Sequence, residues 1–123
     1  MPFTAVLGIE VLSSSAEEVR ARIPWTEERC TAGGVLHGGV LIGLADACGG
    51  TVAFLNLPEG ANGTTTIESK TNFFRAVRSG FVEAVSKPLH KGRTTVVVET
   101  DLLDSDGKHV ARVTQTQAVL YPR

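Results

Sequence analysis

One short stretch of the chain holds most of the residue types that could do chemistry. Residues 36–50 read LHGGVLIGLADACGG, so a histidine, an aspartate and five glycines interrupt an otherwise apolar sequence. A carboxylate among apolar neighbours, such as that of Asp46, is a candidate general base or nucleophile. The alternative is purely structural: Asp46 would bond to a neighbouring donor where two helices pack at an interface between chains.

The two glycines after His37 offer a second kind of chemistry. Gly38 and Gly39 stand at the expected beginning of a helix, where the first backbone N–H groups have no partner within the helix. Donors at the positive end of the helix dipole suit an anion or a developing oxyanion, and glycine leaves room for a substrate carbonyl. The alternative is that these glycines only form a tight turn from a loop into the helix.

A single helix, from His37 to about Asn56, would position both groups. At about 100° per residue its large apolar side chains form one stripe, which we expect to lie on a sheet. The members of this stripe are Leu41, Leu44, Cys48, Val52 and Leu55. On the opposite side, Gly39, Gly43 and Gly50 would clear a furrow around Asp46, although each interior glycine costs a helix about 0.5–1 kcal/mol relative to alanine.

The spacing of His37 and Asp46 predicts that each site needs two chains. Nine residues separate them, which is about 13 Å along a helix and about half a turn in direction. Reacting atoms must approach to about 3–3.5 Å. If the Gly38 N–H and Asp46 are both catalytic, two antiparallel helices must complete each other's sites in a two-fold dimer.

The rest of the chain predicts strands that would cover this helix. Residues 19–23 alternate in polarity after a turn at Ser13–Ser15, which indicates two N-terminal strands. Four further strands are expected at 64–74, 80–89, 93–103 and 109–121, with turns at HKG (90–92) and DSDGK (104–108). A helix that is apolar nearly all round must be covered on several sides, which predicts an α+β fold with a curved antiparallel sheet wrapped around it.

Length and composition indicate one domain over residues 1–123. The 12 basic and 13 acidic residues nearly balance, which argues against a nucleic-acid or membrane-surface partner. Cys30 and Cys48 have no cysteine or histidine cluster beside them, so we expect no metal site and favour free thiols over a disulfide. With no basic N-terminal region and no long apolar run, we expect a cytoplasmic protein.

These motifs together resemble the hotdog-fold acyl-CoA thioesterases, most closely the phenylacetate-degradation (PaaI-like) group. The resemblance rests on GGVLHGGVLIGLADACGG, TTTIESKTNFFRAVRSG and KPLHKGRTTVVVETDLLDSDGK, and it covers about residues 5–121. It implies hydrolysis of an aryl, arylacetyl or medium-chain acyl-CoA to the acid and coenzyme A, without a separate cofactor. The turn SKPLHKGR is also similar to that of hotdog enzymes for hydroxynaphthoyl-type thioesters, which carry Glu where Asp46 stands, so both subgroups stay open.

The resemblance implies four catalytic residues. Asp46 would act as nucleophile or general base, and the Gly38 N–H would form the oxyanion hole. His37 would orient the site. Thr66, near the start of the strand after the helix, would help to position water.

Substrate-binding roles are expected for a second group of residues. Thr64 is the second choice for the hydroxyl near the start of the strand, and Gly39 and Gly43 line the expected furrow. Thr31 stands six residues before the histidine, where many members of the family carry Asn or Gln to hold the lytic water or the substrate. A threonine hydroxyl there is a departure from that pattern.

Coenzyme A carries phosphates, so the resemblance implies a local basic patch despite the near-neutral net charge. Arginine suits phosphate because its guanidinium presents a fork of donors. The candidates are Arg75, Arg78, His90, Lys91, Gly92 and Arg93.

The expected partner besides substrate is a second copy of the chain, in a dimer with shared active sites and then a dimer of dimers. Two alternatives remain. One is a non-catalytic acyl-CoA-binding hotdog protein. The other is a hotdog enoyl-CoA hydratase, which would pair the aspartate with a histidine about five residues later, and no histidine follows Asp46 at that spacing.

Overall fold

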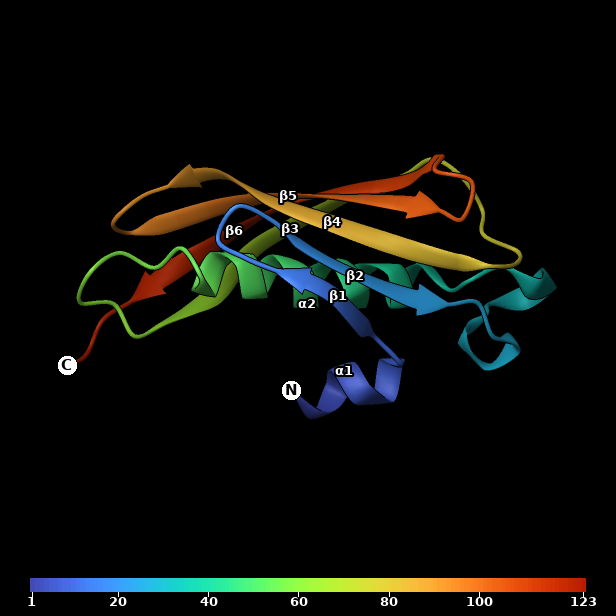
Figure 1. Ribbon diagram of the computed structural model, residues 1–123, viewed down its shortest axis with the longest axis horizontal. Coiled ribbons are helices and arrows are strands. Elements are labelled where there is room, and N and C mark those ends of the chain that lie inside the picture. Colours follow the sequence, from blue (N-terminus) through green and yellow to red (C-terminus); the bar gives the residue numbers. More distant parts are fainter.

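A six-stranded antiparallel sheet curves over one long helix (Figure 1). The computed structural model describes all residues, 1–123. The strands are β1 (Glu10–Ser14), β2 (Val19–Pro24), β3 (Gly63–Phe73), β4 (Phe81–Lys91), β5 (Thr95–Asp104) and β6 (His109–Leu120). Their order in the sheet is β1-β2-β4-β5-β6-β3, so the strand that follows the helix, β3, forms one edge. The α+β arrangement predicted from the sequence is confirmed.

The long helix, α2, runs from Gly38 to Phe54. It begins after His37, whose ring Nδ1 accepts a hydrogen bond from the Gly39 N–H at 2.8 Å. This side-chain cap satisfies one of the donors that every helix leaves free at its start. The predicted helix is therefore correct to within two residues at each end.

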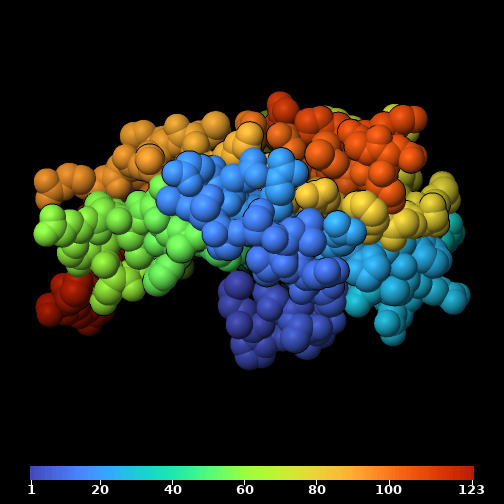
Figure 2. Space-filling view, in the orientation of Figure 1, coloured from blue at the N-terminus to red at the C-terminus, as the bar shows by residue number.

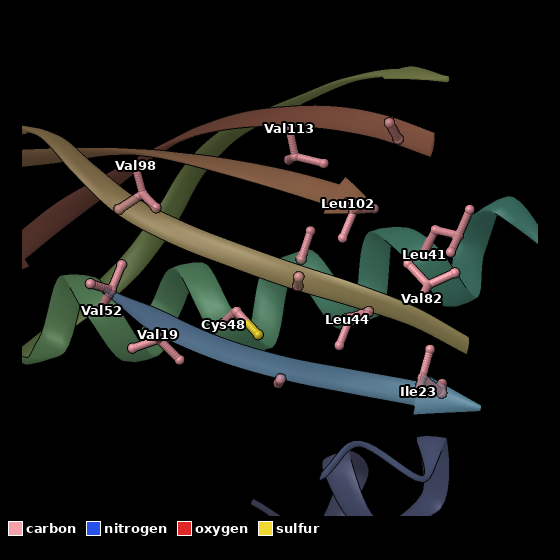
Figure 3. Packing of buried hydrophobic residues seen from close by; sticks show 14 of the residues in the cluster. Val19, Ile23, Leu41, Leu44, Cys48, Val52, Val82, Val98, Leu102 and Val113 are labelled. Atoms are coloured by element: carbon pink, nitrogen blue, oxygen red, sulfur yellow. The ribbon is translucent and has the colours of Figure 1, made fainter. Parts of the chain in front are cut away.

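The core lies between α2 and the concave face of the sheet (Figure 3). Four members of the predicted apolar stripe, Leu41, Leu44, Cys48 and Val52, are buried there. Full burial of each large aliphatic side chain contributes about 1.5–3 kcal/mol to folding. The fifth member, Leu55, was placed wrongly: the helix ends one residue earlier, and Leu55 is 43% exposed.

A short helix, α1 (Pro2–Leu7), packs on the side of α2 that faces away from the sheet (Figures 1 and 2). The sequence analysis did not predict it, although Pro2 at its first turn and Gly8 in the left-handed region after it (φ 74°) are typical helix boundaries. A Cβ added at Gly43 would lie 2.8 Å from Leu7 Cδ1. The missing side chain at Gly43 therefore makes room for α1, so the predicted furrow is partly filled by the chain itself.

The connections confirm one predicted turn and correct two others. In the DSDGK hairpin, Asp104 Oδ1 accepts from the N–H groups of Asp106 and Lys108, both at 2.9 Å. The HKG turn lies two residues later than predicted, because a bulge between Pro88 and His90 extends β4 to Lys91. The first turn also lies later, since β1 continues to Ser14. Two short 3₁₀ turns, Glu27–Arg29 and Ala32–Gly34, precede α2.

Gly49 and Gly50 provide a test of the packing between α2 and β6. A Cβ added at Gly49 would lie 2.5–2.7 Å from the side-chain amide of Gln115, which is only 1% exposed, whereas a Cβ at Gly50 would meet nothing within 4 Å. Both substitutions gain the same helix propensity, so only the clash distinguishes them. We expect Gly49→Ala to be less stable than Gly50→Ala by about 1–3 kcal/mol in the free energy of unfolding, measured by urea denaturation. Equal stabilities would contradict the packing described here.

Candidate active site

The carboxylate of Asp46 lies in an open groove between the second half of α2 and the beginning of β3. The groove, called here the aspartate groove, encloses about 630 Å³. Residues that line it include Asp46, Gly50, Thr64, Thr65, Thr66 and Gln117. Asp46 is exposed within the single chain and takes part in none of its ion pairs. Its carboxylate is therefore free to meet a substrate.

The pairing of β3 with β6 explains why two of the predicted threonines reach this groove. Thr64 lies opposite Val119, and Thr66 opposite Gln117. Both β6 side chains are buried toward the helix, and directly opposed residues of an antiparallel pair share a face. Thr64 and Thr66 therefore point toward α2, and the structure brings them together with Asp46.

Gln117 is a groove residue that the sequence analysis missed. Its side-chain Nε2 donates a hydrogen bond to Thr66 Oγ1 at 2.6 Å, and the residue is only 2% exposed. The signal was present, because the alternation Val113, Gln115, Gln117 places two glutamines on the apolar face of the last strand. Buried amides need hydrogen-bond partners, so such residues mark positions to inspect.

The start of α2 lies in a second groove, called here the helix-start groove, of about 390 Å³. Thr31 and Gly38 line it together with Phe73, whose Cζ would lie 3.2 Å from a Cβ at Gly38. The His37 ring accepts a hydrogen bond from the Gly39 N–H, whereas the Gly38 N–H donates to no group of the chain. A free donor at the positive end of a seventeen-residue helix is suited to a developing oxyanion.

The two grooves lie at opposite ends of β3 and share no residue. Gly38 and Asp46 are eight residues apart on α2, which is about 12 Å along the axis. One chain thus holds the free N–H in one groove and the carboxylate in another, as the sequence spacing predicted.

The two other predicted substrate-binding residues, Gly39 and Gly43, line neither groove. A Cβ at Gly39 would lie 2.9 Å from the Nδ1 of His37, and Gly43 lies under Leu7 of α1. The close approaches at these glycines are made by the chain's own side chains.

The basic residues predicted for coenzyme A form two groups. Arg75 lines the helix-start groove, and Arg78 Nη1 donates to the Gly33 carbonyl at 3.1 Å at the same end of the molecule. The second group, His90–Arg93, lies at the end of β4 and in the turn that follows it. The Val119 N–H donates to the Thr94 carbonyl, which holds this turn beside the other end of the sheet. A single chain does not bring the two groups together.

The structure holds no cluster of three or more His, Cys, Asp or Glu side chains that could bind a metal ion. Both cysteines are free. Burial raises the pKa of the Cys48 thiol to about 12, so this residue is a packing element rather than a nucleophile. No helix is long and apolar enough to cross a bilayer.

Comparison with known proteins identifies the family. The family model described as the thioesterase superfamily matches residues 33–111. This range includes all the residues of α2 that line the two grooves. A thioesterase from Haemophilus influenzae superposes with a TM-score of 0.90 at 30% identity, covering 97% of this chain and 82% of that one. This fold and site define a thioester hydrolase with the hotdog fold. The chain belongs to the thioesterase superfamily.

Two further proteins are informative. The 1,4-dihydroxy-2-naphthoyl-CoA hydrolase of Escherichia coli is 33% identical over 87 residues, covering 71% of this chain and 63% of that protein. A hypothetical thioesterase protein from Streptococcus pneumoniae, solved with coenzyme A, superposes with a TM-score of 0.86 at 25% identity, covering 99% of this chain and 95% of that one.

A proline substitution removes the free N–H of Gly38 at a position where proline suits the helix. Proline suits the first helical position, and His37 already has the extended conformation (φ −64°, ψ 133°) that precedes proline. We expect Gly38→Pro to lower kcat for thioester hydrolysis about 10²–10³-fold, as loss of one oxyanion donor does. The measurement is steady-state release of free thiol from an acyl-CoA.

The matched control is Gly38→Ala, which adds a Cβ at the same place, beside Phe73, but keeps the N–H. It should retain most of the kcat that the proline variant loses. Equal losses in the two variants would show that the added atoms, rather than the missing donor, matter.

Proposed function

We propose that the protein hydrolyses an acyl-CoA thioester to the free acid and coenzyme A. One observation carries this proposal. The helix α2 presents an exposed carboxylate without an ion-pair partner, that of Asp46, in one groove, and a free backbone N–H, that of Gly38, in the other. The hydrolase of Escherichia coli and the structure with coenzyme A support a coenzyme A thioester as the substrate.

The chemistry follows from these two groups. In one route Asp46 attacks the thioester carbon and displaces the coenzyme A thiolate, and water then hydrolyses the resulting mixed anhydride to the free acid. In the other, Asp46 takes a proton from a water that attacks the same carbon, and the thiolate leaves as the acid forms. In both routes negative charge develops on the carbonyl oxygen, and the Gly38 N–H accommodates it. Thr66 supplies a hydroxyl beside Asp46 that can hold the water.

A two-fold dimer would complete the site. β3 is an edge strand with free backbone groups along one side, and Ile67 in its middle is 63% exposed. Edges of this kind are commonly paired or covered. If a second β3 pairs with it antiparallel, the Thr66 end of one copy comes to the Phe73 end of the other. The Asp46 of one chain then faces the Gly38 of its partner, and a dimer of dimers would build on this unit.

The same two-fold symmetry would bring the two groups of basic residues close to each other. Arg75 and Arg78 lie at the end where α2 begins, and the His90–Arg93 turn lies at the end where it stops. Antiparallel pairing brings the first group of one chain toward the second group of the other. The phosphates of coenzyme A would then bind between chains.

The acyl group of the substrate is proposed to be aryl, arylacetyl or medium-chain, as in the PaaI-like group. The open shape of the aspartate groove and its threonine wall are compatible with an acyl group that carries polar substituents. We also propose that the protein acts in the cytoplasm.

Asp46→Asn tests the mechanism. The amide can act neither as a nucleophile nor as a base, so we expect kcat to fall by about 10²–10⁴-fold, measured as free thiol released from a panel of acyl-CoAs. Glu10→Gln is the control, because Glu10 is an exposed carboxylate on β1, the edge of the sheet opposite β3, and lines neither groove. Undiminished turnover in Asp46→Asn would refute the mechanism, and binding without hydrolysis by the unaltered protein would favour a non-catalytic acyl-CoA-binding role.

Arg93→Gln tests the phosphate contact. The variant removes the charge but leaves the Arg93 carbonyl, which accepts a hydrogen bond from the Tyr121 hydroxyl. We expect KM to rise about tenfold for an acyl-CoA, as the loss of a charge-assisted contact implies. KM should not change for the corresponding acyl-pantetheine, which lacks the nucleotide. Equal effects on both substrates would place Arg93 outside the nucleotide site.

A further inference from the structure

Gln117 connects the buried side of β6 to the aspartate groove. It is only 2% exposed, yet it contributes to the groove wall, and its Nε2 donates to Thr66 Oγ1 at 2.6 Å. No other hydrogen bond of the chain involves the Thr66 hydroxyl. Thr66 is paired in register with Gln117, and a bulge between Thr66 and Glu68 shifts the pairing of β3 with β6 directly afterwards.

The direction of this hydrogen bond determines what Thr66 can do. A hydroxyl has one donor hydrogen and two acceptor lone pairs. Because Gln117 donates to the oxygen, the O–H hydrogen of Thr66 must point to another acceptor. The groove contains one ionisable acceptor, Asp46, together with the space in which water or a carbonyl would bind.

We propose that Gln117 is a positioning residue of the active site: by donating to Thr66, it turns the Thr66 O–H toward the water or substrate beside Asp46. This inference rests on the proposed function, since it assigns Gln117 a part in the same hydrolysis. In this proposal Gln117 acts through the threonine and not directly on a reacting atom.

The neighbouring Gln115 shows that burial of a glutamine on this face does not require such a role. Gln115 is 1% exposed and lies two residues earlier on the same side of β6. Its amide packs against Gly49, neither of its polar atoms has a hydrogen-bond partner in the chain, and it lines neither groove. The strand therefore provides a matched control with the same residue type, burial and orientation.

A double-mutant cycle tests the proposal. Gln117→Leu should lower kcat about tenfold with little change in KM, because one oriented hydrogen bond is lost at a step after binding. Thr66→Val should lower kcat by a similar factor.

If Gln117 acts only through Thr66, adding Gln117→Leu to Thr66→Val should lower kcat no further, because the effects of substitutions within one hydrogen-bond network do not add. Gln115→Leu should leave kcat unchanged, and thermal unfolding of each variant confirms that it is folded.

Gln117→Glu should change the pH dependence of kcat, which a residue with a purely structural role would not affect. An ionised carboxylate accepts the Thr66 O–H and draws it away from the groove, whereas a protonated carboxyl can still donate. The ratio of variant to unaltered kcat should therefore be low at neutral pH and rise at least fivefold as the pH falls through the pKa of the introduced carboxyl. Burial should place that pKa above the ordinary value of about 4.3.

The proposal would be overturned by unchanged kcat in Gln117→Leu, by losses that multiply in the double variant, or by a pH-independent ratio for Gln117→Glu. An equal loss in Gln115→Leu would also overturn it, because it would assign the effect to packing. These results are distinguishable from failure of the proposed function. If the unaltered protein hydrolyses no acyl-CoA, or does so without needing Asp46, both proposals fall; if hydrolysis depends on Asp46 but not on Gln117, only the present one does.

Discussion

A rigid helix sets the distance between the two groups on which the proposed chemistry depends. Gly38 and Asp46 lie on α2, about 12 Å apart along its axis, while the atoms of a reacting thioester must meet both groups within a few ångströms. The helix cannot bend to bring them together, because the curved sheet holds its buried face along most of its length. Under the proposed mechanism a second chain must therefore complete each site, and β3, as an edge strand, offers a place for that chain to pair.

The glycines of α2 show how one helix meets several demands. At its start Gly38 exposes a backbone donor, and Gly43 admits Leu7 of the N-terminal helix. In the second half Gly49 gives room to the buried amide of Gln115, whereas Gly50 opens toward the aspartate groove. Each glycine weakens the helix by about 0.5–1 kcal/mol relative to alanine, and the core packing on the other face offsets that cost. Gly38, Gly43 and Gly49 are thus separate points of close approach, whereas Gly50 leaves open space beside the aspartate groove.

The sequence predicted the parts of the fold that depend on periodicity and turn chemistry. Apolar spacing located α2, and the DSDGK turn located the β5–β6 hairpin. It did not predict α1, which is too short to be stable alone and depends on packing against Gly43. A bulge after Pro88 displaced the next turn, and bulges leave little trace in a pattern of residue types.

For the site, the sequence singled out residues of α2 and β3 that the structure places in the two grooves, but it did not show how the molecule groups all the candidates. The family resemblance implied that Asp46 and Thr66 share one site, and the structure places them in one groove. Gln117 was missed because its place in the groove depends on a contact between β6 and β3, two strands far apart in the sequence. The two basic groups were taken as one patch, because a sequence does not show which end of a sheet a loop occupies.

The most direct test of the shared site uses a heterodimer with one Asp46→Asn chain and one Gly38→Pro chain, purified through two different affinity tags. Each single-variant protein is expected to lose most of its activity, for a different reason. In the heterodimer the intact Gly38 of one chain faces the intact Asp46 of the other at one site, while the second site carries both defects. Shared sites therefore predict about half of the unaltered dimer's activity, since one of two equivalent sites is restored. Activity no higher than that of the two single-variant proteins would contradict the account.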